Sequence, residues 1–291
     1  MATPFDDAGE VDLAGAEVLA RALVAEGNDG IVVTGSTGEA STLSDEERLD
    51  LWRCVAAAVD VPVLAGSTSN DTRHSVELTA AASDCGVAGI LAVTPYYNRP
   101  SQAGLEAHFR AVAGATDLPV VLYDIPIRTG RKIASETILR LARDVENVVG
   151  LKDAAADPAA TARLLAEVPD GFECYAGDDA LVLPFLSVGA VGVISVASHW
   201  AAPELGAMID AFLAGDLAGA LALQRRLLPS FAFLGSDAAP NPVPTKAMLR
   251  VMGLPAGQCR LPLGDAPEGL EEAAKAVLAP LEAARRPGAG A

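Results

Sequence analysis

Residues 119–152 read PVVLYDIPIRTGRKIASETILRLARDVENVVGLK, and this stretch decides the fold class. Two apolar runs, Pro119–Asp124 and Val148–Lys152, enclose an amphipathic segment at Ser135–Ala142. Because each run is apolar throughout, both faces of each predicted strand are expected to be buried, as in a parallel sheet covered by helices. The stretch therefore predicts one strand, helix and strand unit of an α/β protein.

The same unit repeats along the chain. The other predicted strands share the apolar, β-branched character and are Gly30–Val33, Val61–Ala65, Gly89–Val93, Glu173–Ala176 and Val191–Val196. The other predicted helices are Ala14–Ala25, Ser44–Ala58, Asp71–Cys85, Gly104–Ala115, Pro158–Ala166 and Ala180–Val188. Strand starts that recur about every 20 to 30 residues predict a (β/α)8 TIM barrel. A doubly wound sheet is the competing architecture, although no GxGxxG fingerprint follows the first strands.

The two ends of the chain depart from this rhythm. Seven strands can be counted, so the eighth has to come from Met1–Phe5, which supplies only its last few residues. We expect this first strand to be truncated, with the coding start upstream of Met1. From Pro203 on, the pattern is helical, with breaks expected at Gly215, Pro229, Asn241–Pro244 and Pro255. The sequence thus predicts a barrel over residues 1–215 and a C-terminal helical extension over residues 216–291.

Composition excludes several classes of function. The chain of 291 residues carries 21 Lys and Arg against 38 Asp and Glu, and the net charge of −17 disfavours nucleic-acid or membrane-surface binding. No apolar run approaches the roughly 20 residues of a membrane span, and no secretory signal is visible at the start, so we expect a cytoplasmic protein. The four cysteines form no CxxC pair and the three histidines lack metal-ligand spacing, which disfavours a metal site.

Lys152 is the first candidate for chemistry, because it ends an apolar strand where a barrel places its active site. Burial in an apolar barrel lowers the pKa of a lysine and frees the amine, which can then form a Schiff base with a carbonyl substrate. The competing interpretation is a strand-end lysine that snorkels to the rim.

Other strand ends supply further candidates. Tyr123 ends one strand and could relay protons, and Arg128 follows it with a guanidinium suited to a carboxylate, unless the two are simply a core tyrosine and a loop arginine. Ser36 and Thr37 lie between glycines in Gly35–Glu39, a loop that suits a small carboxylate. The segment Thr94–Pro100 is both aromatic and polar, as in a lid or an oligomer contact.

These residues occur in ordered motifs. The motifs are GSTGE at Gly35–Glu39, TPYYNRP at Thr94–Pro100, YDIPIRTG at Tyr123–Gly130, GLKD at Gly150–Asp153, GDD at Gly177–Asp179, GVISV at Gly192–Val196 and PNPVPTK at Pro240–Lys246. Together they resemble the dihydrodipicolinate synthase and N-acetylneuraminate lyase family over nearly the whole chain. Members of that family are pyruvate-dependent (β/α)8 aldolases that form a lysine imine.

The resemblance implies a role for each site residue. Lys152 would carry the imine, and Tyr123, Ser36 and Tyr97 would relay protons, with Tyr97 donated across a dimer interface. Thr37 would hold the pyruvate carboxylate. The backbones of Gly177 and Ile194 would line the pocket. Ser36 stands where the synthases usually have threonine, but it keeps the hydroxyl group.

Arg128 indicates which reaction is expected, because a carboxylate substrate calls for a cation where a sugar acid calls for small polar groups. The resemblance implies condensation of pyruvate with L-aspartate 4-semialdehyde to 4-hydroxy-tetrahydrodipicolinate, the first committed step toward diaminopimelate and lysine. The alternatives are another pyruvate-dependent aldolase, acting on N-acetylneuraminate or a 2-keto-3-deoxy sugar acid, and a catalytically silent paralogue.

The resemblance also has implications for cofactors, partners and regulation. No cofactor is implied beyond the imine on Lys152, and the expected partner is a second copy of the chain, in a tetramer built from dimers. Lysine-inhibited members use histidine and glutamate side chains at the positions held here by Asp45, Arg48 and His74. Weak or absent inhibition by lysine is therefore expected.

Overall fold

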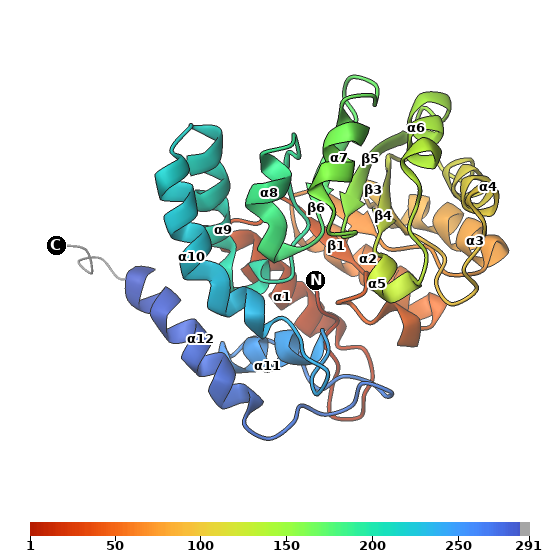
Figure 1. Ribbon diagram of the computed structural model, residues 1–291. Coiled ribbons are helices and arrows are strands. Elements are labelled where there is room, and N and C mark those ends of the chain that lie inside the picture. The colour runs from red at the N-terminus through yellow and green to blue at the C-terminus, as the bar shows by residue number, and fades with distance from the viewer. Residues whose placement is uncertain (286–291) are drawn as a thin grey trace. The chain divides into compact units, whose positions relative to one another are not determined.

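The computed structural model describes residues 1–285, and these form two compact units (Figure 1). The first unit contains Met1–Asp29, Thr34–Val59 and the described residues from Val196 on. The second contains Gly30–Val33 and Asp60–Ser195. Residues 286–291, which belong to the predicted C-terminal extension, lie outside the described part. The predicted domain boundary after Gly215 falls between two helices and remains a proposal.

The second unit is built on a parallel sheet of seven strands. The strands are β1 (Ile31–Val33), β2 (Val63–Ala65), β3 (Gly89–Val93), β4 (Val120–Asp124), β5 (Val148–Asp153), β6 (Glu173–Ala176) and β7 (Gly192–Val193). The intervening helices are α3 (Thr72–Ala82), α4 (Gln102–Ala113), α5 (Pro126–Thr129), α6 (Ser135–Asp144), α7 (Pro158–Leu165) and α8 (Val182–Leu186), with short 3-10 turns at Ser83–Cys85 and Asp179–Leu181.

The strand order settles the architecture. Each strand pairs in parallel with the next one along the chain, from β1 to β7, with no reversal of the order. A doubly wound sheet requires such a reversal, so that alternative is wrong and the TIM-barrel class is confirmed. Side chains from β1, β2 and β3 share one hydrophobic cluster with Val121 and Tyr123 of β4, as expected when a curled sheet turns one face inward.

A bulge in β5 decides which residues point inward. Val120 pairs with Val148, but Val121 pairs with Gly150, so Val149 is an extra residue in the ladder. Since side chains alternate along a strand, one extra residue exchanges the two faces for everything that follows it. Lys152 is thereby brought into register with Tyr123 on the inner face.

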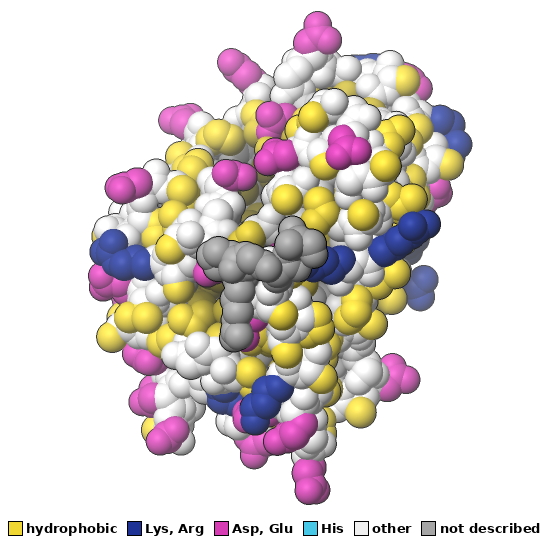
Figure 2. Space-filling view, turned by 90° about the vertical axis from the view of Figure 1, so that its left-hand side faces the viewer, with side chains coloured by type: hydrophobic (Ala, Val, Ile, Leu, Met, Phe, Trp, Pro, Cys, Tyr) yellow, Lys and Arg dark blue, Asp and Glu magenta, His cyan; other side chains and the backbone are white. Residues whose placement is uncertain are grey.

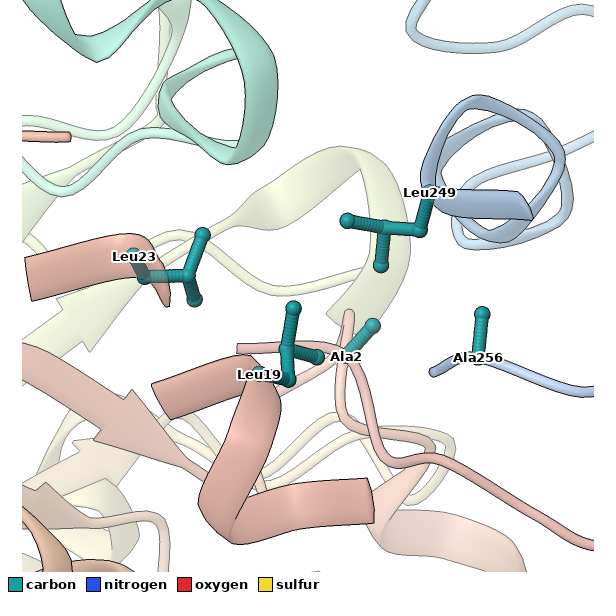
Figure 3. Close-up of a cluster of buried hydrophobic side chains, with 5 residues drawn as sticks. All are labelled: Ala2, Leu19, Leu23, Leu249 and Ala256. Carbon is teal, nitrogen blue, oxygen red and sulfur yellow. The ribbon is translucent and has the colours of Figure 1, made fainter. Parts of the chain in front are cut away.

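The first unit is helical in its described residues. Its helices are α1 (Leu13–Ala25), α2 (Asp45–Ala58), α9 (Ser198–Leu213), α10 (Leu217–Phe233), α11 (Val243–Val251) and α12 (Leu270–Arg285), with a 3-10 turn at Ala40–Thr42. Figure 3 shows one of its cores, in which Ala2 of the N-terminal segment meets Leu19 and Leu23 of α1, Leu249 of α11 and Ala256. The start of the chain is thus part of the hydrophobic core of this unit.

The expected strand at Met1–Phe5 is not formed. Phe5 makes only an isolated antiparallel bridge with Val11. The backbone groups of the segment are used elsewhere: the Ala2 N–H donates to His199 Nε2 at 3.0 Å, and the Phe5 N–H donates to the Ala256 carbonyl at 3.2 Å.

Two further expectations are corrected. The strand predicted at Val191–Val196 is only Gly192–Val193. Pro229 does not break a helix but lies inside α10, where the flanking Leu227 and Ser230 are buried and Ser230 accepts a hydrogen bond from Trp200 at 3.1 Å. Tertiary packing therefore outweighs the local cost of the proline. The expected break at Gly215 is confirmed. The break expected at Asn241–Pro244 lies at residues 234–242, because Val243 and Pro244 already belong to α11.

The surface is consistent with the acidic composition. On the face shown in Figure 2, acidic side chains are scattered over the surface, in keeping with the net charge of −17. Within residues 1–285, no helix combines the length and the apolar character that crossing a bilayer would require.

Candidate functional site

Lys152 lies one residue before the end of β5 and is buried, with 8% of its surface exposed. Its Cα is in register with Tyr123 on β4 and with Tyr175 on β6. The Lys152 Nζ atom is 4.3 Å from the centre of the Tyr123 ring. Lys152 is therefore held against an aromatic wall inside the sheet, and the snorkelling interpretation does not describe it.

Tyr123 is almost fully buried at 5% exposure and packs with Leu91, Val121 and Ile125. Half-buried Ile194, which follows β7, packs against the same cluster. Lys152, Tyr123 and Ile194 thus share one largely apolar wall. The amine of Lys152 is the nucleophile that this wall offers, a group that can form a Schiff base with a carbonyl substrate.

Gly177 follows β6 and lies beside the end of β5. Its N–H donates to the Asp153 carbonyl at 2.7 Å, and a Cβ atom at this position would lie 2.7 Å from the Ala154 Cβ. Only glycine fits this approach of the two strand ends. Gly150 is similar, because an added Cβ would lie 2.7 Å from the Glu173 carbonyl oxygen. The two glycines let β5 and β6 bring Lys152 and the Gly177 backbone together.

Arg128 lies in α5, the single helical turn that follows β4, and its side chain is exposed. Tyr97 lies in the loop after β3 and is 89% exposed. The loop is strained, since Tyr97 has φ 73° and Arg99 has φ 48°, values that non-glycine residues rarely adopt. Neither Tyr97 nor Arg128 belongs to the buried wall around Lys152.

Ser36 and Thr37 belong to the first unit, in the turn Gly35–Glu39. Both are half-buried, and the Thr37 hydroxyl accepts a hydrogen bond from Asn241 Nδ2 at 2.9 Å. Gly38 is required here, because an added Cβ would lie 3.0 Å from the Thr34 Cα. The turn is thus closely packed within its own unit.

A buried ion pair fixes the end of this turn. The Lys246 Nζ atom lies 2.6 Å from Glu39 Oε1, and the two side chains are 1% and 0% exposed. Lys246 also donates to the Gln258 carbonyl at 2.9 Å and lies 3.9 Å from the centre of the Phe5 ring. The second carboxylate oxygen of Glu39 accepts from the Arg260 N–H at 2.9 Å. Burial lowers the pKa of Lys246, and the charge of Glu39 opposes that shift.

Two buried carboxylates lie behind the wall, within the YDIPIRTG and GLKD motifs, and the sequence alone indicates no role for them. Asp124 and Asp153 directly follow Tyr123 and Lys152, so the strand alternation turns them to the opposite face. Burial raises the pKa of Asp124 to about 6; Asp153 adds to the shift, and Lys132 opposes it. An aspartate at the end of an otherwise apolar strand is the sequence signal that could have identified them.

Tyr175 was also missed as a site neighbour. It lies in register with Lys152 on β6, and its hydroxyl donates to Glu173. Burial and this hydrogen bond raise the pKa of Tyr175, so the phenol stays protonated. The signal was present, because Tyr175 is one of four tyrosines and lies on a predicted strand.

Within residues 1–285, no group of three or more His, Cys, Asp or Glu side chains is placed to hold a metal ion.

Comparison with known proteins identifies the family. The profile of the dihydrodipicolinate synthetase family matches residues 1–281. The chain is 52% identical over 281 residues to the 4-hydroxy-tetrahydrodipicolinate synthase of Symbiobacterium thermophilum, covering 96% of this chain and 95% of that protein. It is 46% identical over 265 residues to the enzyme of the same name from Bacillus subtilis, covering 90% and 91%.

Solved structures agree with the sequence relatives. A dihydrodipicolinate synthase from Bacillus anthracis superposes with a TM-score of 0.92 at 42% identity, covering 96% of this chain and 95% of that one. The same values hold for the enzyme from Cyanidioschyzon merolae, whose structure has lysine bound. Sequence and fold therefore agree that this chain belongs to the dihydrodipicolinate synthetase family.

Proposed function

We propose that the chain is a 4-hydroxy-tetrahydrodipicolinate synthase, a lyase that condenses pyruvate with L-aspartate 4-semialdehyde in the biosynthesis of diaminopimelate and lysine. The observation that carries the proposal is the buried Lys152 amine at the end of β5, 4.3 Å from the centre of the Tyr123 ring. Relatives about half identical to the chain over nearly their whole length bear that enzyme's name.

The chemistry follows from the amine. Lys152 attacks the keto carbon of pyruvate, water is lost, and the resulting iminium withdraws electrons from the methyl carbon. Loss of a methyl proton gives an enamine, whose carbon attacks the aldehyde of the semialdehyde. The amino group of the semialdehyde part then attacks the iminium carbon and closes the ring, and the bond from that carbon to the Lys152 nitrogen breaks, which releases the cyclic product and regenerates the Lys152 amine. The imine is the only electron sink that this sequence of steps requires, so the proposal includes no cofactor.

Each predicted site residue has a part in this proposal. Tyr123 and Ser36, together with Tyr97 from a second copy, relay the protons that imine formation and carbon–carbon bond formation require. Thr37 holds the pyruvate carboxylate. Arg128 binds the carboxylate of the semialdehyde as a fork of donors.

The backbones of Gly177 and Ile194 line the pocket in this proposal. Two observations support these two roles: Ile194 packs in the cluster of Tyr123, and the Gly177 N–H donates to the carbonyl of Asp153, the residue after Lys152. The role of Arg128 is supported by its exposed place directly after the strand of Tyr123.

We further propose that the active form is a homo-oligomer, a tetramer built from dimers. The support is Tyr97, an aromatic side chain that is 89% exposed on a residue with a positive φ of 73°, since exposed aromatic side chains are typical of interfaces between chains. One structural neighbour, 35% identical, is described as a monomeric dihydrodipicolinate synthase variant, so sedimentation of this chain is an informative measurement. A monomer that remains fully active would exclude a role for Tyr97 in trans.

A direct assay separates the proposed reaction from its alternatives. The purified protein is incubated with pyruvate and aspartate semialdehyde, and the product is followed by mass spectrometry. Parallel reactions contain N-acetylneuraminate or a 2-keto-3-deoxy sugar acid. Product from the first mixture alone supports the synthase. Cleavage of a sugar acid would indicate another aldolase, and inactivity in every mixture would indicate a silent paralogue.

A further inference from the structure

The Asp124 side chain links the two ends of the loop that carries Arg128. The loop, residues 125–132, runs from the end of β4 to the segment before α6 and contains the single turn α5. Asp124 precedes the loop and is 1% exposed. Its Oδ1 atom accepts the Ile133 N–H at 3.1 Å, and its Oδ2 atom lies 3.5 Å from Lys132 Nζ. One carboxylate therefore joins the two ends of the loop into a ring.

Asp124 cannot itself face the reacting groups. Tyr123 belongs to the inner cluster, and successive side chains of a strand point to opposite faces. Asp124 is instead turned toward the segment that leads into α6, where both of its partners lie. Burying a carboxylate is costly unless it is paired and hydrogen-bonded, and the Ile133 N–H and Lys132 supply those partners to Asp124. Any effect of Asp124 on substrate has to pass through the loop.

A second set of bonds holds the C-terminal end of the loop from the side of α4. Gln102, the first residue of α4, donates to the Lys132 carbonyl at 2.9 Å and accepts from the Ala134 N–H at 2.9 Å. Arg99 donates to the Gly130 carbonyl at 3.1 Å, and Arg131 donates back to the Arg99 carbonyl at 3.1 Å. The chain around Tyr97 and the C-terminal end of the loop that contains Arg128 are thus joined by several hydrogen bonds.

We propose that Asp124 is a positioning residue for the second substrate, closing the 125–132 loop so that the Arg128 guanidinium is held where it receives the semialdehyde carboxylate, with Gln102 as its partner across the loop. The inference rests on the proposed function, since it assigns Arg128 to that substrate. A loop closed by a side chain has fewer conformations to lose when it binds a ligand, and pre-organisation of this kind is expressed as affinity.

The test compares two substitutions at Asp124. Asp124→Ala removes both contacts, whereas Asp124→Asn keeps an oxygen that can accept from Ile133. At pH 8, where the carboxylate is ionised, we expect the alanine variant to raise the KM for aspartate semialdehyde by about tenfold, the effect of one lost hydrogen bond. The KM for pyruvate and the rate of borohydride trapping with pyruvate alone should stay within about twofold, and asparagine should restore most of the loss.

Controls separate positioning from general damage. Asp157→Ala removes a carboxylate that caps α7 through the Ala160 N–H at 2.9 Å, outside both loops, and should leave both KM values unchanged. If Asp124→Ala does not fold, Gln102→Ala, at the half-exposed start of α4, tests the same loop and should raise the same KM selectively.

Three results would overturn the inference. An unchanged semialdehyde KM in a folded Asp124→Ala protein would show that the ring does not matter for binding. Equal rises in both KM values would show a merely structural residue. A wild-type protein that is trapped by pyruvate but does not turn over the semialdehyde would remove the proposed function itself, and this is seen before any variant is made.

Discussion

Removing the amine of Lys246 should destabilise the first unit far more than removing an exposed lysine. The Lys246 Nζ atom lies 2.6 Å from Glu39 Oε1, and both side chains are at most 1% exposed. Lys246→Met leaves the Glu39 carboxylate buried without its cation. Breaking a buried pair in this way costs about 3 to 5 kcal/mol. For a chain of this size, each kcal/mol corresponds to about 2 to 4 °C, so we expect the melting temperature to fall by about 10 °C.

The assay is a double-mutant cycle measured by urea unfolding and by thermal melting. Glu39→Gln removes the charge and keeps an oxygen that can accept the Arg260 N–H, which Glu39 now accepts at 2.9 Å. The double variant should therefore recover about half of the loss caused by Lys246→Met. Since Glu39→Gln is itself expected to destabilise the protein, the coupling energy should be at least about 2 kcal/mol. The matched control is Lys275→Met, because Lys275 is paired with Glu272 on the surface at 62% and 73% exposure. The control should move the melting temperature by about 1 °C at most.

Two results would refute this reasoning. If Lys246→Met melts within about 2 °C of the parent protein, the pair does not hold the structure together. If the effects of the two single variants simply add in the double variant, the contact between Lys246 and Glu39 carries no coupling energy. In either case the account of how the Gly35–Glu39 turn is anchored would be wrong.

Three further predictions follow from other parts of the molecule. Arg128→Ala should raise the KM for aspartate semialdehyde at least tenfold and leave pyruvate trapping intact, and steady-state kinetics would contradict it if pyruvate use fell equally. His108 is buried, and burial lowers its pKa from 6.5 to about 4. The folded protein therefore resists protonation of His108, and the contribution of His108 to the free energy of unfolding should be constant above pH 6.5 and fall by about 3 kcal/mol as the pH drops toward 4. Urea unfolding at pH 7.5 and 5 should show a smaller loss in His108→Gln than in the parent. Millimolar lysine should inhibit turnover weakly or not at all, because the family resemblance implies that Asp45, Arg48 and His74 stand where inhibited members use histidine and glutamate side chains. Strong inhibition in the product assay would contradict this expectation.

The strands were largely predictable because an apolar run between turn residues is a local signal. The bounds of β3 and β6 agree with the prediction residue for residue. The strand predicted at Met1–Phe5 and the full length predicted for Val191–Val196 were wrong. Strand formation depends on hydrogen bonds to a neighbouring strand, which a local pattern does not contain. The helix break predicted at Pro229 was also wrong. Burial of Leu227 and Ser230 in α10 outweighs the low helix propensity of this one proline.

The site residues were likewise predictable where the signal is local, and not where their role depends on tertiary contacts. Lys152 and Tyr123 could be found because they end apolar strands, but their shared inner face depends on the bulge at Val149, which no alternation pattern contains. Asp124 was visible in the sequence, yet its role depends on Ile133 and Lys132, which lie across a loop. The role of a side chain that acts through contacts across a loop can be recognised only in the three-dimensional structure.

Borohydride reduction in the presence of pyruvate tests the central claim most directly, because it traps an imine on the residue that forms it. Intact mass would show one pyruvate adduct for each chain, and peptide mapping should place it on Lys152. Lys152→Ala should show no adduct, and aspartate semialdehyde should reduce trapping in the parent protein by consuming the enamine. An adduct on another lysine, or no adduct in a folded protein, would contradict the account.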